Sequence, residues 1–378
     1  MTASHIAIIG GGIVGSTAAY YLARAGVDVT LFEEETGQAT KAAAGIICPW
    51  FSQRRNKPWY YLVSSGADFL RQLMADLQAD TFETEAIFQE DGALLIRNKA
   101  KQLERDQKQG ALKRETAPSI GEIQTLTATE VNQRFPLLET DCSATWVSGG
   151  ARVDGTALIE TLHQAILKHG GKIIAQKATL QQIEPRIQIG TEQSSKPVFF
   201  DRLLLSPGPH LPQLLAPFGY EVDIRPQKGQ LFSVYLEEWE QQHWPVVMPP
   251  GQFDIIPFNN GEIVIGATHE DEMGADLTVD QMKLDELSEA ASQWMPALIG
   301  RTIHRRKVGT RAYTSDYGVL VGQVPQQDHI WAISGLGSSG LTSGPFLGYQ
   351  WAQLMLTEQW AIDPVDFPIE AYITIALD

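Results

Sequence analysis

The feature that most constrains this chain is a glycine cluster following a short apolar run at its start. The run His5–Ile9 leads into Gly10, and three further glycines, Gly11, Gly12 and Gly15, follow within five residues. A helical pattern continues to Ala25, and a second apolar run stops at Glu33, 23 residues after Gly10. This order of strand, glycine turn, helix, strand and acid is typical of the unit that binds dinucleotides. A glycine turn without a ligand is the simpler alternative, and the complete order argues against it.

Each part of the turn has a separate expected task. Gly10 permits the tight turn out of the strand, Gly12 leaves room for a pyrophosphate, and Gly15 lets the helix pack closely on the strand. Ile13 and Val14 open the helix, whose N-terminus offers unpaired N–H groups and a partial positive charge to phosphates. The sequence therefore predicts a phosphate site at this turn.

Two acids end the second strand of the unit. Glu33 can accept hydrogen bonds from both hydroxyls of a ribose, and Glu34 lies beside it in the candidate site. Because a 2′-phosphate would face a carboxylate there, the site disfavours NADP. An NAD-dependent dehydrogenase shares this first motif and stays open on the motif alone.

Composition limits the choice of partners. The chain has 378 residues, 43% of them hydrophobic, enough for two domains or two lobes around a sizeable core. Its net charge of −16 argues against nucleic acid and anionic membranes as partners. The uncharged stretch 6–23 is interrupted by the glycine cluster, so we expect buried strand and helix rather than a membrane span. Cys48 and Cys142 form no metal-ligand or disulfide pattern, so we expect no metal and a cytoplasmic location.

The rest of the chain alternates between two kinds of pattern. Apolar spacing predicts helices over 59–77 and 155–169, surface helices within 99–134, a helical stretch over 280–300, and an apolar helix ending at 356. Short apolar runs predict strands at 92–96, 172–175, 201–206 and 330–334. Between 227 and 267, apolar runs separated by turns indicate an antiparallel sheet. We find no internal repeat.

Together these pieces resemble the D-amino-acid oxidase superfamily of FAD-dependent oxidoreductases, especially glycine oxidase, sarcosine oxidase and D-amino-acid dehydrogenase-like enzymes. The resemblance is carried in chain order by Gly10–Gly15 with Glu33, Ala42–Gly45, Ser206–Gly208, Lys228–Gln230, Gly309–Arg311 and Gly335–Gly344. It implies an α/β fold with a Rossmann-like FAD-binding domain and a substrate domain built on a large mixed, mainly antiparallel sheet. It implies an FAD domain from 1–80, 140–220 and 305–378, and a substrate domain from 81–139 and 221–304.

The resemblance also implies the cofactor contacts. An alanine-glycine loop would run along the flavin ring, a polar pair would reach the pyrophosphate, and one backbone position would meet the adenine. These residues are Ala43, Ala44, Gly45 and Ile46 for the loop, Thr40 and Lys41 for the polar pair, and Thr179 for the adenine. The turn Ser206, Pro207 and Gly208 ends a strand at the edge where α/β sheets place ligands.

A second glycine-rich turn lies near the end of the chain. Because a reduced flavin carries negative charge at its N1–C2=O edge, a turn that opens a helix can aim N–H groups at that edge. The residues expected to do this are Gly335, Gly337, Ser338, Ser339, Gly340, Leu341 and Thr342. A helix cap whose glycines serve only close packing is the alternative.

Three residues are expected at the substrate. Arg311 matches the arginine with which family enzymes hold the substrate carboxylate in a two-point pair, and it also borders the flavin. His269 matches a histidine near the flavin of sarcosine oxidases, where it could orient an amine. Asp254 stands where glycine oxidase has a tyrosine, and could pair with an amine or a basic side chain.

Two departures from the family pattern bear on substrate and oxidant. The second arginine of glycine oxidase is missing from the final loop, and Arg54, Arg55, Tyr61, Tyr313 and Tyr317 are the candidates to replace it. Ile265 and Thr342 stand where some sarcosine oxidases place lysines, which favours slow reaction with oxygen. No cysteine follows Cys142, so the resemblance implies non-covalent FAD.

The expected activity is oxidation of a small amino acid by hydride transfer from its α-carbon to flavin N5. A D-amino acid, glycine or an N-methyl amino acid would give an imino acid and then a 2-oxo acid. Oxidation of a 2-hydroxy acid or polyol phosphate, and a flavin-holding subunit of a multi-subunit dehydrogenase, remain alternatives. The electron acceptor, oxygen or a redox partner, and any homo-oligomer are left open.

Overall fold

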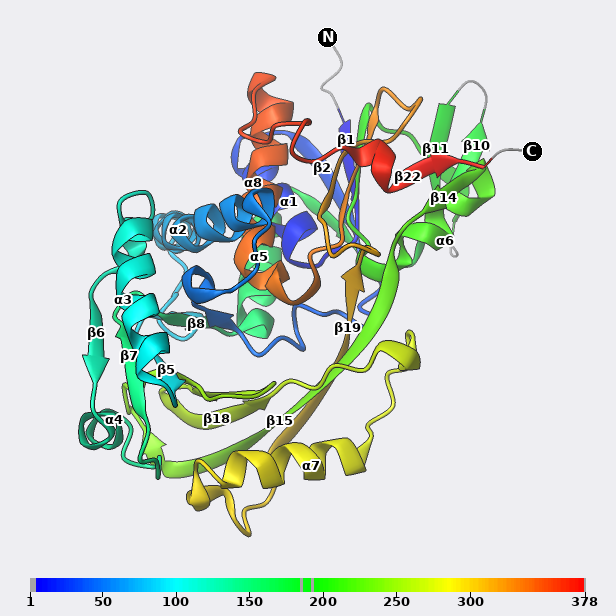
Figure 1. Cartoon of the computed structure of the whole chain (residues 1–378). Coiled ribbons are helices and arrows are strands. Elements are labelled where there is room, and N and C mark those ends of the chain that lie inside the picture. Colours follow the sequence, from blue (N-terminus) through cyan, green and yellow to red (C-terminus); the bar gives the residue numbers. More distant parts are fainter. Residues whose placement is uncertain (1–4, 184–185, 192–193, 377–378) are drawn as a thin grey trace.

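The first motif lies in a six-stranded sheet at the top of Figure 1. The computed structural model describes residues 5–183, 186–191 and 194–376. In spatial order the strands are β20 (Leu320–Gln323), β21 (Ile330–Ser334), β13 (Arg202–Leu205), β1 (His5–Ile9), β2 (Asp28–Phe32) and β9 (Lys172–Ile174). All neighbours are parallel except β20 and β21. Such a sheet is buried on both faces, which explains the continuous apolar runs of β1 and β13.

Helix α1 (Ile13–Arg24) is covered on nearly every side. It packs against α5 (Gly155–Lys168) and α8 (Gly340–Thr357). The contact with α8 is close: a Cβ added at Gly348 would lie 2.3 Å from the carbonyl oxygen of Val14, and one at Gly344 would lie 2.5 Å from Ile13. Because residues 13 and 14 meet 344 and 348 in the same order, the two helices run in the same direction, and their N-termini face the same edge.

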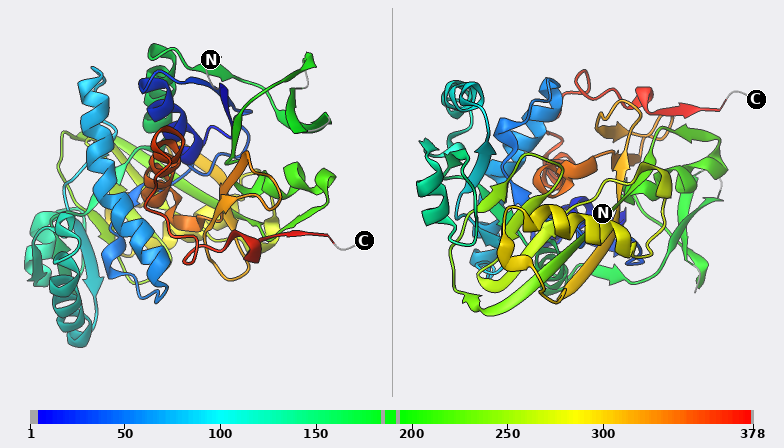
Figure 2. Two further views of the ribbon diagram at one scale, coloured as in Figure 1. Left: turned by 90° about the horizontal axis from the view of Figure 1, so that it is seen from above. Right: turned by 60° about the horizontal axis from the view of Figure 1, so that its bottom comes forward.

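The second large element is an eight-stranded sheet, which curves along the bottom of Figure 1. Its strands in spatial order are β19 (Arg305–Tyr313), β15 (Arg225–Glu240), β18 (Asn260–Gly266), β17 (Asp254–Pro257), β16 (Val246–Met248), β5 (Ala93–Arg97), β7 (Ser143–Val147) and β6 (Ile123–Leu126). Only the β16–β5 pair is parallel. Helix α7 (Gln281–Ser292) covers the outer face with Leu284 and Leu287, as the right-hand view of Figure 2 shows.

Smaller elements complete the chain. Three small sheets are β3 (Ile46–Ile47), β8 (Ala151–Val153) and β4 (Phe88–Gln89); β10 (Ala178–Ile183), β11 (Arg186–Thr191) and β12 (Ser194–Val198); and β14 (Tyr220–Val222) with β22 (Ile373–Ile375). The remaining helices are α2 (Lys57–Ala79), α3 (Ala100–Arg114), α4 (Ala128–Arg134) and α6 (Leu211–Leu215). Among the described residues, no helix is both long enough and apolar enough to cross a membrane.

The predicted fold class is confirmed: parallel and mainly antiparallel sheets lie in one α/β chain. The segments 1–80, 140–220 and 305–378 supply every strand of the six-stranded sheet, while β7 and β19 from the same ranges join the larger one. The expectation of surface helices within 99–134 was incomplete, because strand β6 lies between α3 and α4. The stretch 280–300 is helical only over α7 and a short turn at Pro296–Leu298.

Candidate active site

The glycines of the turn between β1 and α1 have different surroundings and therefore different roles. Gly10 has a φ of +102°, and a Cβ there would lie 2.4 Å from the carbonyl oxygen of Ser206. A Cβ at Gly15 would lie 2.0 Å from the carbonyl oxygen of Gly10, so the helix meets the strand backbone. At Gly12, the nearest atom to such a Cβ is Thr40 Oγ1, 3.6 Å away. Gly10 and Gly15 therefore serve packing, whereas Gly12 borders open space.

Glu33 and Thr40 complete the edge of this turn. The Glu33 carboxylate is buried at the end of β2 and accepts the N–H groups of Gly11 and Glu35. Thr40 Oγ1 accepts the Ile13 N–H at 3.1 Å, which places its hydroxyl at the N-terminus of α1. Both side chains are thus fixed where a ribose and a phosphate would lie.

A first cavity of about 330 Å³ opens against the turn. Its lining comes from β1, the β2 end, β10, the 206–210 turn and the C-terminal turn. Of the predicted residues, it contains Gly10, Gly12, Ile13, Val14, Glu33, Glu34, Thr40, Thr179, Ser206, Pro207, Gly208, Gly335, Gly337 and Gly340. Gln38 also lines it, and both its amide atoms are buried without a hydrogen-bond partner in the described structure. An unsatisfied amide of this kind indicates that a polar ligand belongs there.

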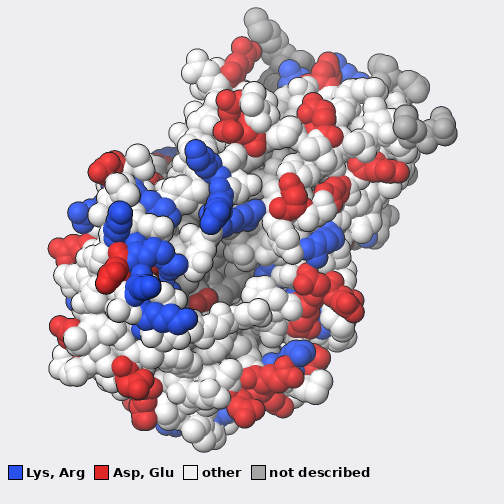
Figure 3. Space-filling model, viewed as in Figure 1, with Lys and Arg blue, Asp and Glu red and all other residues white. Residues whose placement is uncertain are grey.

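A second cavity of about 370 Å³ lies between the alanine-glycine loop, the C-terminal turn and the eight-stranded sheet. Of the predicted residues, it contains Thr40, Ala43, Ala44, Gly45, Ile46, Asp254, His269, Arg311, Gly337, Ser338, Ser339, Gly340, Leu341 and Thr342. A hollow opens on the face of the molecule drawn in Figure 3, with Lys and Arg side chains gathered along one side.

The two cavities meet. Ala39, Thr40, Gly337 and Gly340 line both of them, so the first and last glycine turns border one continuous space. The N-terminus of α1 lies at the first cavity and that of α8 at the second. Two helix ends with positive partial charge thus face this joined space.

The donors of the C-terminal turn differ from those expected. The Ser338 N–H is donated to Tyr313 Oη at 3.0 Å, and the Ser339 N–H to the carbonyl of Leu336 at 3.1 Å. A 3₁₀ turn over Gly337–Ser339 runs directly into α8, so the turn and the helix form one continuous helical stretch. The backbone N–H groups of Ser338 and Ser339 are therefore already used within the protein.

Arg311 is held along one edge. Its guanidinium lies over the backbone of Gly229, 2.8 Å from where a Cβ would stand. Nη1 donates to Gln227 Oε1 at 2.9 Å and to the Thr268 carbonyl at 3.0 Å. The other guanidinium N–H groups have no acceptor within the described part of the chain. Burial lowers the pKa of Arg311, yet an arginine stays charged, so a fixed cation offers free donors to the cavity.

His269 and Asp254 line the same cavity, and both have pKa values shifted from the ordinary ones. Burial, with the nearby charge of Arg311, lowers the pKa of His269 below its ordinary value, so the ring is neutral at pH 7. Burial raises the pKa of Asp254 to about 7. The cavity thus holds one permanent cation and one acid that titrates near neutrality.

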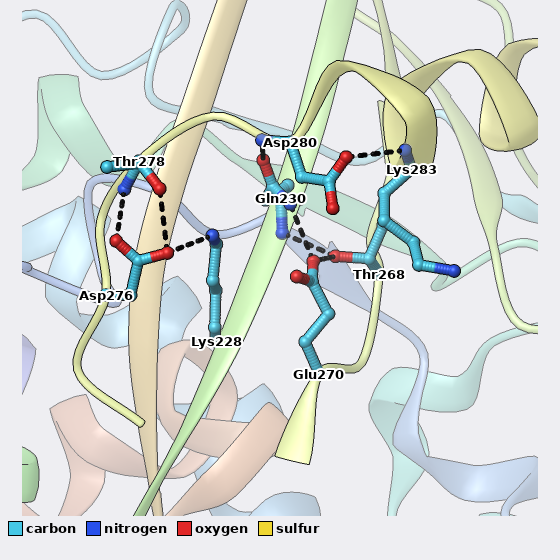
Figure 4. Close-up of polar contacts among 8 residues, drawn as sticks. All are labelled: Lys228, Gln230, Thr268, Glu270, Asp276, Thr278, Asp280 and Lys283. Carbon is cyan, nitrogen blue, oxygen red and sulfur yellow. Dashed lines mark hydrogen bonds and ion pairs between the residues drawn. The ribbon is translucent and has the colours of Figure 1, made fainter. Parts of the chain in front are cut away.

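A polar network on the opposite face of β15 supports Arg311 (Figure 4). The fully buried Lys228 ammonium lies 2.8 Å from Asp276, whose pKa falls to about 2 because Lys228 and Thr278 donate to it. Glu270 accepts from Gln230 at 2.7 Å and from Thr268 at 2.5 Å. These contacts fasten the segment 268–280, which carries the carbonyl that accepts from Arg311 and also carries His269.

Replacing Asp276 should destabilise the protein more than replacing Lys228. Asp276→Asn leaves a fully buried ammonium without its counter-charge, which should lower the free energy of unfolding. Lys228→Met leaves a carboxylate that is partly open to water, so it should cost less. Thermal denaturation should therefore rank wild type above Lys228→Met, and Lys228→Met above Asp276→Asn. Equal melting temperatures for the two variants would contradict the buried pairing.

Two predicted cofactor residues line neither cavity. Gly15 is consumed by the helix–strand contact, and Lys41 pairs with Glu35 at 3.1 Å on the surface. None of the candidates for a second carboxylate anchor lines the second cavity. Arg54, Tyr313 and Tyr317 border a neighbouring hollow that shares Ser338 and Ser339 with it, and Arg54 donates to the Tyr317 carbonyl.

Several lining residues were missed in the sequence. On the substrate side these are Cys48, Trp59, Val63, Met248 and Gln252, from segments that carry no motif. Trp59 donates its ring N–H to Ser339 Oγ at 3.1 Å, which ties α2 to the C-terminal turn. Gly229 and Gly309 also line the cavity, and their place in the motifs Lys228–Gln230 and Gly309–Arg311 could have identified them as site residues. Among the described residues, no group of three or more His, Cys, Asp or Glu is arranged to hold a metal.

Comparison with known proteins is consistent along the whole chain. The family model described as DAO, FAD dependent oxidoreductase, matches residues 5–354. An uncharacterized oxidoreductase of Bacillus subtilis is 38% identical over 94% of this chain and 96% of its own length. Glycine oxidase of Pseudomonas putida is 25% identical, over 97% and 98% respectively. Among solved structures, iminodiacetate oxidase from Chelativorans sp. BNC1 has a TM-score of 0.90 and 31% identity, over 95% of this chain and 97% of that one.

Proposed function

Because the chain belongs to the DAO family of FAD-dependent oxidoreductases, we propose that it oxidises a small amino acid at the bond between α-carbon and nitrogen. The observation that carries the proposal is Arg311, which alone among the described residues of the second cavity brings a permanent positive charge. A fixed guanidinium with free donors is suited to a carboxylate. The names of the similar glycine oxidase and iminodiacetate oxidase support amino acids with a primary or substituted amine.

The joined cavities fit FAD. The adenosine end would lie by Glu33 and Thr179, the pyrophosphate by Gly12 and Thr40, and the ring system in the second cavity. The unsatisfied Gln38 amide and the open space at Gly12 support this placement. Cys48 lines the second cavity, but burial raises its pKa to about 12. A thiol that stays protonated is a poor nucleophile, which supports non-covalent binding.

The residues of the chain would position rather than transform the substrate. Bound FAD supplies the hydride acceptor. Arg311 would fix the carboxylate, the apolar side chains Val63 and Met248 would exclude water, and the N-terminus of α8 would favour negative charge. The product would be an imino acid, which water converts to a 2-oxo acid and ammonia or an amine.

An anaerobic screen of flavin absorbance tests this function. Glycine, sarcosine, iminodiacetate and D-amino acids form one set of reductants, and 2-hydroxy acids and polyol phosphates form the other. We expect bleaching by at least one member of the first set and none by the second. Bleaching only by the second set would overturn amine oxidation, and bleaching by neither until a second protein is added would favour a flavin-holding subunit.

Three further proposals accompany this function. The FAD domain would comprise 1–80, 140–220 and 305–378, and the substrate domain 81–139 and 221–304. The protein would work in the cytoplasm, which its two free cysteines support. The electron acceptor would be oxygen or a redox partner. Thr342, at one of the two lysine positions of the resemblance, lines the second cavity and supports slow reaction with oxygen. Ile265, at the other position, instead packs in the core with Leu284 and Leu287 of α7.

A further inference from the structure

Arg311 and Asp254 stand on one face of the eight-stranded sheet. Strand register pairs Arg311 with Gln227, Leu231 with Gly266, and Gly266 with Asp254. Because directly paired residues share a face and alternate residues of a strand do too, all of these residues stand on one face of the sheet, and Arg311, Gly266 and Asp254 line the second cavity there. Arg311 and Asp254 therefore project from the same face of the eight-stranded sheet.

Three glycines lie on this face between them. Gly229, Gly309 and Gly266 line the cavity, and Leu231 carries a side chain on the same face beside Gly266. A Cβ at Gly229 would strike the Arg311 guanidinium, and one at Gly309 would lie 2.7 Å from Ala42. Because the glycines bring no side chain into the cavity, a small molecule can lie against the backbone between the two charged groups.

The Asp254 carboxyl has no partner of its own. No hydrogen bond or ion pair to it is found within the described residues, and its neighbours in the cavity include Met248 and Ala267. The titratable side chains that line the cavity with it are Arg311 from β19, His269 from the segment after β18, and Cys48 near β3. Arg311 is occupied along one edge by Gln227 and Thr268 and does not pair with Asp254.

We propose that Asp254 receives the amine of the substrate: its carboxylate binds the ammonium group and then takes one proton from it. This inference rests on the proposed function and names the substrate class as α-amino acids, with a primary or secondary amine, bound as zwitterions. Arg311 holds the carboxylate end and Asp254 the nitrogen end. Asp254 is a catalytic residue in this assignment because it touches the reacting nitrogen.

Burial makes the proton transfer feasible. A buried carboxyl is harder to ionise and a buried ammonium is easier to deprotonate, so their pKa values approach each other in the cavity. That of Asp254 already stands at about 7. His269 is neutral and Cys48 stays a thiol at this pH, so Asp254 is the group of the cavity that can change charge.

The step balances in protons and electrons. The ammonium R–CH(NH3+)–COO− gives one proton to the Asp254 carboxylate and becomes the free amine. Its nitrogen lone pair then supports departure of the α-hydrogen with two electrons to bound FAD, which leaves an iminium. Water adds to the iminium carbon, and the nitrogen leaves as ammonium or an alkylammonium ion, so that a 2-oxo acid forms. The proton on Asp254 returns to solvent.

Two unreactive ligands separate the amine from the carboxylate. 2-Aminoisobutyrate carries both groups but has no α-hydrogen, and isobutyrate is the same molecule without the amine. Dissociation constants with the FAD-loaded enzyme are read from the flavin absorbance band and from the heat of binding. For wild type at pH 8, we expect 2-aminoisobutyrate to bind at least about tenfold more tightly than isobutyrate.

Variants of Asp254 and the dependence of binding on pH test whether Asp254 causes the preference for 2-aminoisobutyrate over isobutyrate. Asp254→Asn should bring the two ligands to nearly equal affinity, and Asp254→Glu should restore part of the difference. Asp285→Asn, an exposed change on α7, is the matched control and should behave as wild type. Since the ammonium prefers the ionised acid, affinity for 2-aminoisobutyrate should rise up to about tenfold from pH 6 to 8, and this rise should vanish in Asp254→Asn.

Either of two results overturns the inference. One is wild type that binds 2-aminoisobutyrate no more tightly than isobutyrate, and the other is Asp254→Asn that keeps the wild-type ratio. The anaerobic screen distinguishes this failure from failure of the proposed function. Amino acids could bleach the flavin while Asp254→Asn keeps the wild-type ratio of the two dissociation constants. That pair of results would rule out the role of Asp254 and would still support amine oxidation.

Discussion

Replacing Gly12 by valine should give a folded protein that no longer retains FAD. The backbone at Gly12 has φ −69° and ψ −172°, which valine adopts readily. A Cβ there meets no protein atom nearer than 3.6 Å, so the side chain enters the first cavity where we place the pyrophosphate. Loss of two charge-assisted hydrogen bonds to phosphate should weaken FAD binding by at least about 100-fold. Flavin absorbance per purified chain measures the effect.

Gly15→Val is the matched comparison. Its Cβ would lie 2.0 Å from the backbone oxygen of Gly10, so this variant should lose stability whether or not FAD is present. Circular dichroism and thermal denaturation of the two variants should therefore separate binding from folding. A yellow, fully loaded Gly12→Val protein would show that the phosphate lies elsewhere.

Arg311→Met should sharply lower the catalytic efficiency with a carboxylate substrate. The methionine keeps much of the volume over Gly229 but removes the charge and the free donors. Loss of a buried, two-point charge pair costs about 3 kcal/mol or more, so kcat/KM should fall at least about 100-fold. Steady-state kinetics on the substrate found in the anaerobic screen measures the loss, and it should appear mainly in KM.

Two controls accompany the Arg311 prediction. Arg311→Lys keeps a charge but not the forked geometry, so it should recover only part of the activity. FAD content should stay near wild type in both variants if the principal role of Arg311 is to hold substrate. Unchanged kinetics in Arg311→Met would remove this residue from the substrate site.

Local patterns predicted the elements that depend on neighbouring residues. The strand, glycine turn and helix from His5 to Arg24 lie where the sequence places them, because glycine spacing and apolar periodicity act over a few residues. Strand β6, over Ile123–Leu126, was missed within a polar stretch. Its two central residues are exposed and it gains its structure by pairing with β7, a contact that the local pattern does not contain.

Residues of the candidate site likewise fall into those that motifs could place and those that only the fold brings together. Arg311 and the two glycine turns could be placed from motifs, whereas Trp59, Met248 and Gln252 reach the cavity through long-range packing of unmarked segments. Lys41 follows Thr40 directly, yet only Thr40 borders the cavities. The Thr40 hydroxyl is held by the α1 backbone, whereas the longer side chain of Lys41 reaches Glu35.

One FAD is expected to bridge the first and last glycine turns, and titration of the apo-protein with flavins measures whether it does. Fluorescence quenching should give one FAD per chain, and ADP should compete with FAD one for one because both need the first cavity. FMN alone should bind far more weakly. FAD that binds unhindered beside saturating ADP would contradict the account, since the adenosine end would then lie outside the cavity at Gly12 and Glu33.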